Sequence, residues 1–253
     1  MSELHESFEG KSKIENTPQP KVDALSILEK GEIISAETLE GFFPIKVVKI
    51  KDDGKALFRP DGFVYERLEK REDLRTELEL LAYSLDQVLE FGLVPPVISR
   101  KLSEDGIKGT FQKFIENAEL AANYGTNWPE VVVESEILKA AVFDFLINAQ
   151  DRHGGNFLVD PDSGKIWLID HDLHMFVHMF TRGGIPSDIL AEAVKRNLTE
   201  LPEEIIKSIQ RLYDRINYLS PTSIDLKVQE ILLGIKNRAR NLLDDRKIKA
   251  EEP

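Results

Sequence analysis

The sequence predicts an α+β fold, in which a small strand-rich N-terminal lobe with one helix precedes a larger helical C-terminal lobe. Two observations support this prediction. Up to residue 117 the expected elements run strand, strand, helix, strand, strand, and after it helical periodicity dominates. We expect a disordered tail over residues 1–22, the N-terminal lobe over 23–117 and the C-terminal lobe over 118–253. A cleft between two such lobes is the natural place for a ligand.

The N-terminal lobe is predicted from a hairpin and a helix. Residues 44–50 are rich in β-branched side chains, residues 52–54 read Asp-Asp-Gly, and residues 56–59 resume an apolar run, which indicates two strands and a turn. Residues 71–90 place a leucine at every third or fourth position among charged residues, which predicts an amphipathic helix. Gly92 ends it.

The rest of the chain continues this pattern. Residues 97–100 and 109–115 predict two more strands, which complete the N-terminal lobe. Residues 134–150, 202–218 and 224–244 predict the main helices of the C-terminal lobe.

Composition excludes several classes of protein. The chain has 253 residues, no cysteine and a net charge of −12, from 33 Lys plus Arg against 45 Asp plus Glu. The acidic balance argues against a nucleic-acid binder, which gains affinity from basic groups that release counterions. Without cysteine there are no disulfides, iron–sulfur clusters or thiolate zinc sites. Since no transmembrane segment or signal-peptide core is visible, we expect a cytoplasmic protein.

The chemistry concentrates in one segment. Asp151-Arg152-His153-Gly154-Gly155-Asn156 follows the helix expected at 134–150, and a predicted hairpin over 157–169 then leads to Asp170. We expect the two ends of that hairpin to bring Asp151, Asn156 and Asp170 together.

This set of side chains suits phosphoryl transfer from ATP. One carboxylate orients an acceptor hydroxyl, while a neutral oxygen ligand and a second carboxylate hold Mg²⁺ against the phosphates. Asp151 and Asn156 are five positions apart, as in the catalytic loop of protein kinases, and Asp170 follows fourteen positions after Asn156. The alternative is a chance loop rich in Asp and Gly. The predicted reaction moves the γ-phosphate of Mg-ATP to an unidentified hydroxyl-bearing substrate, whether lipid, protein or small molecule.

These residues carry a resemblance to a known family. Asp151 to Asn156, followed by Leu168-Ile169-Asp170, resembles the D-R-H-x-x-N and I-D motifs of the phosphoinositide 3-/4-kinase superfamily. Residues 142–153 are also similar to secretory-pathway casein kinases, and residues 79–86 and 92–96 resemble a small bacterial-type kinase-like branch. The resemblance covers about residues 30–180 and implies a two-lobed, protein-kinase-like fold.

The resemblance also implies roles by position. Asp151 matches the catalytic aspartate and His153 the second catalytic group, although His153 alternatively only binds loop backbone. Asn156 and Asp170 match the metal ligands, and Glu79 matches the glutamate of the N-lobe helix. The remaining positions expected to bind the nucleotide are Ile169 and, as the lining of the adenine pocket through backbone groups, Gln112, Lys113, Phe114 and Ile115.

One position departs from the family pattern. Arg59 stands where the family has a strand lysine, and the two cations bind phosphate differently. Arg59 is then either a working substitute that pairs with Glu79, or a sign of a nucleotide-binding pseudokinase scaffold. Lys49, on the preceding strand, reaches the same phosphate if its side chain faces the cleft. The phosphate-covering loop at 40–43 has a single glycine, and transfer of AMP on the same fold is a further alternative.

A rival hypothesis is a metal-dependent hydrolase. His171, His174 and His178 have helical spacing and, with Asp170 and Asp172, suggest a transition-metal site. The simpler account is a packed surface with scattered histidines.

Overall fold

The computed structural model describes residues 23–39, 45–52, 54–61, 75–103, 106–149, 151–171, 187–219 and 226–248. Three expectations lie outside these residues: the tail at 1–22, the phosphate-covering loop at 40–43, and the part of the proposed metal site formed by Asp172, His174 and His178.

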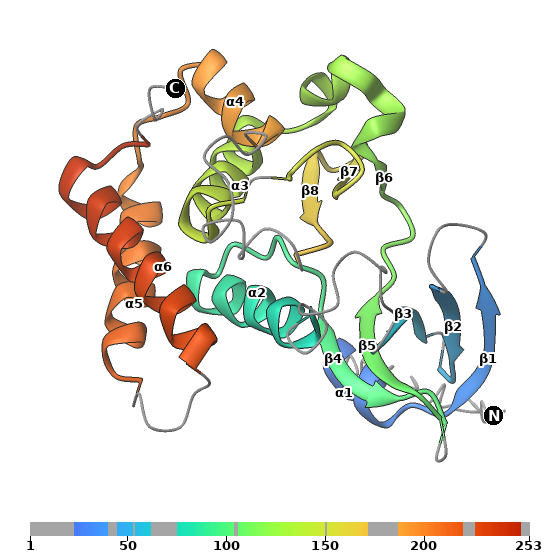
Figure 1. Ribbon diagram of the computed structural model, residues 1–253. Helices are drawn as coiled ribbons and strands as arrows, with labels where there is room; N and C mark the ends of the chain where they lie inside the picture. The colour runs from blue at the N-terminus through green and yellow to red at the C-terminus, as the bar shows by residue number, and fades with distance from the viewer. Residues whose placement is uncertain are drawn as a thin grey trace, which may run out of the picture.

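The chain folds as a mixed α and β structure, as predicted (Figure 1). The N-terminal part contains α1 (Ala24–Lys30), β1 (Ile33–Thr38), β2 (Lys46–Ile50), β3 (Gly54–Pro60), α2 (Arg75–Leu89), β4 (Val97–Lys101) and β5 (Lys108–Lys113). The C-terminal part contains β6 (Glu119–Leu120), the 3₁₀ segment η2 (Ala121–Val131), α3 (Glu134–Ile147), β7 (Phe157–Asp160), β8 (Lys165–Leu168), α4 (Asp188–Lys195), α5 (Glu203–Asn217) and α6 (Leu226–Asp245).

The predicted strands and main helices are confirmed, but five elements were not predicted: α1, β1, β6, η2 and α4. The seven residues of α1 and the eight of α4 are too short for a clear helical period. Strand β1 is an edge strand with mostly exposed residues, so its sequence lacks the alternation of apolar and polar side chains that marks a half-buried strand.

The two faces of the N-terminal sheet carry different side chains. Its five strands are antiparallel in the order β1-β2-β3-β5-β4. Val48, Phe58 and Phe111 are buried on one face, in a cluster with Leu28 of α1. Because neighbouring residues of a strand point to opposite faces, Arg59 points to the other face. Figure 1 shows α2 lying between this sheet and the C-terminal helices.

The C-terminal part is built around α3. Its buried residues lie on all sides, from Ile137 to Ile147, in the larger of two hydrophobic clusters. The helix ends at Asn148, whose left-handed backbone (φ 56°) turns the chain into the loop that carries Asp151. That loop leads directly to the β7–β8 hairpin, which therefore projects from the same end of the core.

Polar contacts join the two parts of the chain. Arg211 of α5 donates to the carbonyl of Leu89 at the end of α2 (3.3 Å), and the amide of Leu168 in β8 donates to the carbonyl of Leu93 (2.8 Å). Helix α2 is thus held from its C-terminal end by α5 and the hairpin. No helix within the described ranges has the length and apolar character needed to cross a membrane.

Candidate active site

The loop between α3 and β7 is organised by its own hydrogen bonds. The side-chain amide nitrogen of Asn156 donates to the carbonyl oxygen of Asp151 (2.8 Å), which also accepts from the amide of His153 (3.0 Å). The loop therefore closes on itself, and it presents the partly exposed Asp151 carboxylate beside Asn156.

His153 is fixed in this loop through one ring nitrogen. Its Nδ1 accepts a hydrogen bond from the amide of Gly155 (3.0 Å). In the neutral ring the proton therefore resides on Nε2, which lies 3.9 Å from Oδ1 of Asp151. The side chain is 54% exposed. The backbone contact foreseen as the alternative role is present, and the exposed Nε2 lies near the expected catalytic aspartate.

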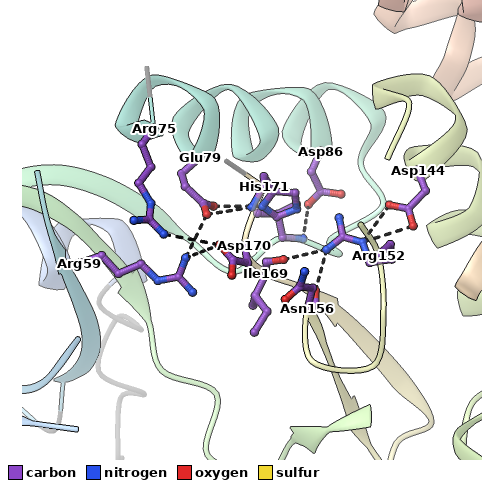
Figure 2. Close-up of polar contacts among 11 residues, drawn as sticks. Arg59, Arg75, Glu79, Asp86, Asp144, Arg152, Asn156, Ile169, Asp170 and His171 are labelled. Carbon is purple, nitrogen blue, oxygen red and sulfur yellow. Dashed lines mark hydrogen bonds and ion pairs between the residues drawn. The ribbon is translucent and has the colours of Figure 1, made fainter. Parts of the chain in front are cut away.

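The two expected metal ligands, Asn156 and Asp170, are brought together by backbone pairing. The amide of Ile169 donates to the carbonyl of Asn156 (3.2 Å), so the residue before Asp170 is bonded to Asn156 itself. The amide nitrogen of Asn156 is engaged by Asp151, and the side-chain oxygen is the atom that suits a hard cation. Figure 2 shows Asn156 next to Ile169, the residue that precedes Asp170.

The buried side chain of Arg152 holds Asn156 and Ile169 in this arrangement. Its guanidinium is fully buried, and Nη1 donates to the carbonyls of both Asn156 (2.6 Å) and Ile169 (2.7 Å). Its Nε lies 3.1 Å from Oδ1 of Asp144 on α3 (Figure 2), and Asp144 also accepts from the hydroxyl of Ser187 at the start of α4 (2.7 Å). The side chain of Arg152 therefore links the loop after α3, the segment before Asp170 and α3 itself, and Asp144 extends the network to α4.

The importance of Arg152 and Asp144 was not predicted from the sequence, although a signal was present. Asp144 is the only charged residue in the apolar run from Ala140 to Ile147. A carboxylate on a helix that is apolar on all sides is buried, and a buried carboxylate requires a cationic partner. Arg152 is the first cationic residue after Asp144 in the sequence.

Arg59 bridges two carboxylates across the site. A single nitrogen, Nη1, lies 2.8 Å from Oδ1 of Asp170 and 3.5 Å from Oε1 of Glu79 (Figure 2). Arg75, at the start of α2, adds a weaker contact to Asp170 at 3.9 Å, which the sequence did not indicate. The pairing of Arg59 with Glu79 is present as expected, but the shorter contact is with Asp170.

Glu79 makes its closest contacts with His171. The backbone amide of His171 donates to Oε1 of Glu79 (2.9 Å), and the ring Nδ1 lies 3.1 Å from Oε2. Burial alone raises the pKa of Glu79, but the hydrogen bond and charge of His171 and the charge of Arg59 outweigh it. The pKa of Glu79 therefore lies below its ordinary value. His171 is fully buried, so the description of this histidine as a surface residue was wrong.

Lys49 lies on the same face of the sheet as Arg59, but its side chain contacts different residues. Lys49 is opposite Lys55, which precedes Arg59 by four residues on β3, so about 13 Å of strand separates the two positions. Its Nζ pairs instead with Glu37 at 3.8 Å, and its side chain is 62% exposed. The structure therefore does not bring Lys49 to the cluster of Arg59, Glu79 and Asp170.

The expected adenine-contacting segment is the end of β5. The amide of Lys113 donates to the carbonyl of Pro96 (2.7 Å), and the amide of Phe114 donates to that of Lys55 (3.0 Å). These two amides are engaged within the protein, and they do not point to a ligand. Gln112 is buried on the face of the sheet that carries Arg59, since its strand neighbour is Leu57. Its contact with adenine stays a prediction.

A cavity of about 460 Å³ lies against the same segment. It is lined by residues of α1, by the start of β3, by residues 113–117, and by Asp160 and Trp167 of the hairpin. Asp170 and Arg59 are not among the described residues that line it, so this cavity is separate from the cluster that carries the expected chemistry.

The hydrolase hypothesis receives no support from the described residues. Among them, no three His, Cys, Asp or Glu side chains are grouped so that they could hold a metal ion. His171, which that hypothesis requires, is bonded to Glu79 in the interior. The arrangement instead offers one carboxylate and one amide oxygen, which suits Mg²⁺ held jointly with phosphates.

Known structures resemble this fold. A crystal structure of the Golgi casein kinase with Mn/ADP bound matches with a TM-score of 0.51 and 15% identity, over 88% of this chain and 74% of that chain. A second crystal structure of the Golgi casein kinase matches with a TM-score of 0.50 and 14% identity, over the same shares. The Helicobacter pylori proinflammatory kinase CtkA matches at 0.41 and 10% identity, over 80% of this chain and 92% of that one.

The Golgi casein kinase structures show that the fold is kinase-like. No curated protein sequence matches the chain. The family model for phosphatidylinositol 3- and 4-kinases matches residues 84–211, which is more than half of the sequence and includes both the D-R-H-x-x-N motif and Asp170. The chain belongs to the phosphatidylinositol 3- and 4-kinase family.

Proposed function

We propose that the protein transfers the γ-phosphate of Mg-ATP to a hydroxyl group of a second substrate. The observation that carries the proposal is the backbone pairing of Ile169 with Asn156, reinforced by Arg152, which sets Asn156 and Asp170 side by side. Membership of the kinase family and the kinase-like fold support the same class of reaction.

Asn156 and Asp170 are the residues proposed to hold the metal ion. Mg²⁺ is commonly bound by one or two protein oxygen ligands together with substrate phosphates and water, so two ligands are sufficient. The ion would neutralise negative charge that develops on the phosphates. The Mn/ADP in the related Golgi casein kinase structure agrees with a nucleotide and a divalent ion on this fold.

Asp151 is proposed to orient the hydroxyl group of the acceptor substrate. Its carboxylate is partly exposed, at 37% of the side chain, so an incoming hydroxyl has access to it. Its carbonyl is held by two loop hydrogen bonds, which fix the position of the residue. His153 places an exposed Nε2 near the carboxylate, where a proton donor orients it and stabilises negative charge.

Arg59 is proposed to contact the nucleotide phosphates. It lies on the face of the sheet opposite the α1 cluster, and its guanidinium touches the expected metal ligand Asp170. A cation beside the metal site can bind an oxygen of a bound phosphate. The same contact also supports the alternative, which is a scaffold that binds nucleotide without transferring a group. The Arg59–Asp170 ion pair competes with a metal ion for the Asp170 carboxylate.

Two measurements test the proposal. The first is the thermal shift produced by ATP with and without Mg²⁺, for the wild type, Asp170→Asn and Asp162→Asn. Asp162 is an exposed residue of the β7–β8 turn and serves as the matched carboxylate control. We expect a Mg²⁺-dependent shift in the wild type and Asp162→Asn only. An equal shift in Asp170→Asn contradicts the metal assignment.

The second measurement uses ATP labelled on either the α- or the γ-phosphate, offered with lipid, protein and small-molecule hydroxyl acceptors. Transfer of the γ label and retention of the α label in the nucleotide product support the proposal. Transfer of the α label identifies AMP transfer instead. A Mg²⁺-dependent thermal shift without transfer of either label identifies the nucleotide-binding scaffold.

A further inference from the structure

We propose that His171, and not the β3 cation, anchors the glutamate of helix α2. In this protein the task of a single lysine is then divided between two residues: His171 holds Glu79, and Arg59 serves Asp170 and the phosphates. The second half of this assignment rests on the proposed function. The first half rests on the contacts of Glu79 alone.

The contacts of Glu79 are unequal. His171 binds both carboxylate oxygens, through its backbone amide at 2.9 Å and its ring Nδ1 at 3.1 Å. Nη1 of Arg59 lies 3.5 Å from Oε1 of Glu79, whereas it lies 2.8 Å from Oδ1 of Asp170. A bidentate contact at hydrogen-bond distance constrains a side chain more than one charge contact outside that range.

The surroundings strengthen the contact with His171. Both side chains are excluded from water, at 0% exposure for His171 and 4% for Glu79, so neither can exchange this partner for solvent. The lowered pKa of Glu79 keeps the carboxylate ionised at neutral pH, and an ionised carboxylate only accepts. Nδ1 of His171 therefore carries the proton and donates it. The ring also packs edge-on against Phe143 of α3, with centroids 6.1 Å apart.

The position of His171 in the sequence gives the contact a functional meaning. Asp170 has a left-handed backbone (φ 61°), so the chain turns sharply between the expected metal ligand and His171. Two consecutive residues then engage different partners, Asp170 with Arg59 and His171 with Glu79 (Figure 2). Displacement of α2 would pull directly on the residue next to Asp170. His171 is thus a positioning residue that sets the place of the metal-binding segment relative to α2.

The experiment compares amide hydrogen exchange of α2 in three variants. His171→Leu fills the ring's space without a donor, His171→Asn retains a nitrogen donor near the position of Nδ1, and Arg59→Met removes the cation. Loss of a charge-assisted hydrogen bond predicts exchange of the α2 amides at least about tenfold faster in His171→Leu. We expect near wild-type exchange in His171→Asn and in Arg59→Met.

Two results would overturn the inference. One is exchange in Arg59→Met accelerated as much as in His171→Leu, and the other is unchanged exchange of α2 in His171→Leu. If His171→Leu does not fold, the decision passes to His171→Asn. Exchange in Arg59→Met no faster than in His171→Asn supports the anchor, and faster exchange in Arg59→Met overturns it.

A second readout separates this inference from the proposed function. The thermal shift with Mg-ATP is measured on the same proteins. We expect Arg59→Met to show a smaller shift, which corresponds to about tenfold weaker ATP binding, while the amides of its α2 remain protected from exchange. If the wild type shows no shift, the proposed function fails, and the exchange data still decide the role of His171. If Arg59→Met binds Mg-ATP as tightly as the wild type, the phosphate role of Arg59 is wrong, and with it the division of tasks.

Discussion

Replacement of Arg152 by methionine tests the buried network that organises the candidate site. Arg152 and Asp144 are both 0% exposed, and the substitution leaves the Asp144 carboxylate with the hydroxyl of Ser187 as a remaining donor. Loss of one partner of a buried ion pair costs about 3 to 5 kcal/mol. The carbonyl of Ile169 also loses this donor, which adds about 1 to 3 kcal/mol if the carbonyl is left unpaired, whereas the carbonyl of Asn156 still accepts from the amide of Ile169.

The expected loss is therefore about 5 kcal/mol or more in the free energy of unfolding. For a chain of 253 residues each kcal/mol lowers the melting temperature by about 2 to 4 °C, so we expect a decrease of about 10 to 20 °C. The assay is urea unfolding together with calorimetry. Arg246→Met is the matched control, because Arg246 pairs with Glu203 at the surface, where such pairs contribute at most about 1 kcal/mol.

A double-mutant cycle identifies the cause of the loss. Asp144→Asn combined with Arg152→Met removes the buried charge as well as its partner, so the double variant should be at least about 2 kcal/mol more stable than the sum of the single losses predicts. If the two losses add within about 0.5 kcal/mol, the carboxylate and the guanidinium do not stabilise each other, and the reasoning is refuted.

Three further predictions concern the site itself. Asp151→Asn should slow transfer about 10²- to 10⁴-fold with an unchanged melting temperature, and an unchanged rate in the labelled-ATP assay would remove Asp151 from the chemistry. Arg59→Lys should keep Mg-ATP binding, because one nitrogen, Nη1, makes both carboxylate contacts and a single ammonium can replace it; loss of the thermal shift would show that guanidinium geometry is required. Glu79 should contribute to stability in a pH-dependent way. Its folded-state pKa lies below the ordinary value of 4.5, so its contribution is fully present above pH 4.5 and is lost as the pH falls through the lowered value. The difference in unfolding free energy between the wild type and Glu79→Gln, measured in urea, should accordingly be constant from pH 7 to about pH 5 and decrease below that range, and a constant difference down to pH 3 would contradict the assignment.

Local patterns in the sequence determined much of the fold. The leucines of α2 repeat with the helical period, and the hairpin strands on either side of the turn at 161–164 are short apolar runs. These signals depend on neighbours a few residues apart, so the sequence alone contains them. The spacing of Asp151 and Asn156 is of the same kind, because both lie in one short loop.

The sequence could not decide which distant residues meet. Arg59 and Asp170 are 111 positions apart, and His171 and Glu79 are 92 positions apart. No periodicity links such pairs, since their distance depends on how the sheet, α2 and the hairpin pack around two separate cores. The pairing of Arg59 with Asp170 and the burial of His171 were therefore visible only in the folded chain.

The sequence by itself determined the order of elements, the family motif and the residue types of the candidate site, because these are local properties of the chain. Tertiary structure alone decided that Arg152 is the buried centre of the site, that Lys49 pairs with Glu37, and that Glu79 is held mainly by His171. The physical reason is that a charged side chain has several possible partners, and burial selects among them by making an unpaired charge too costly.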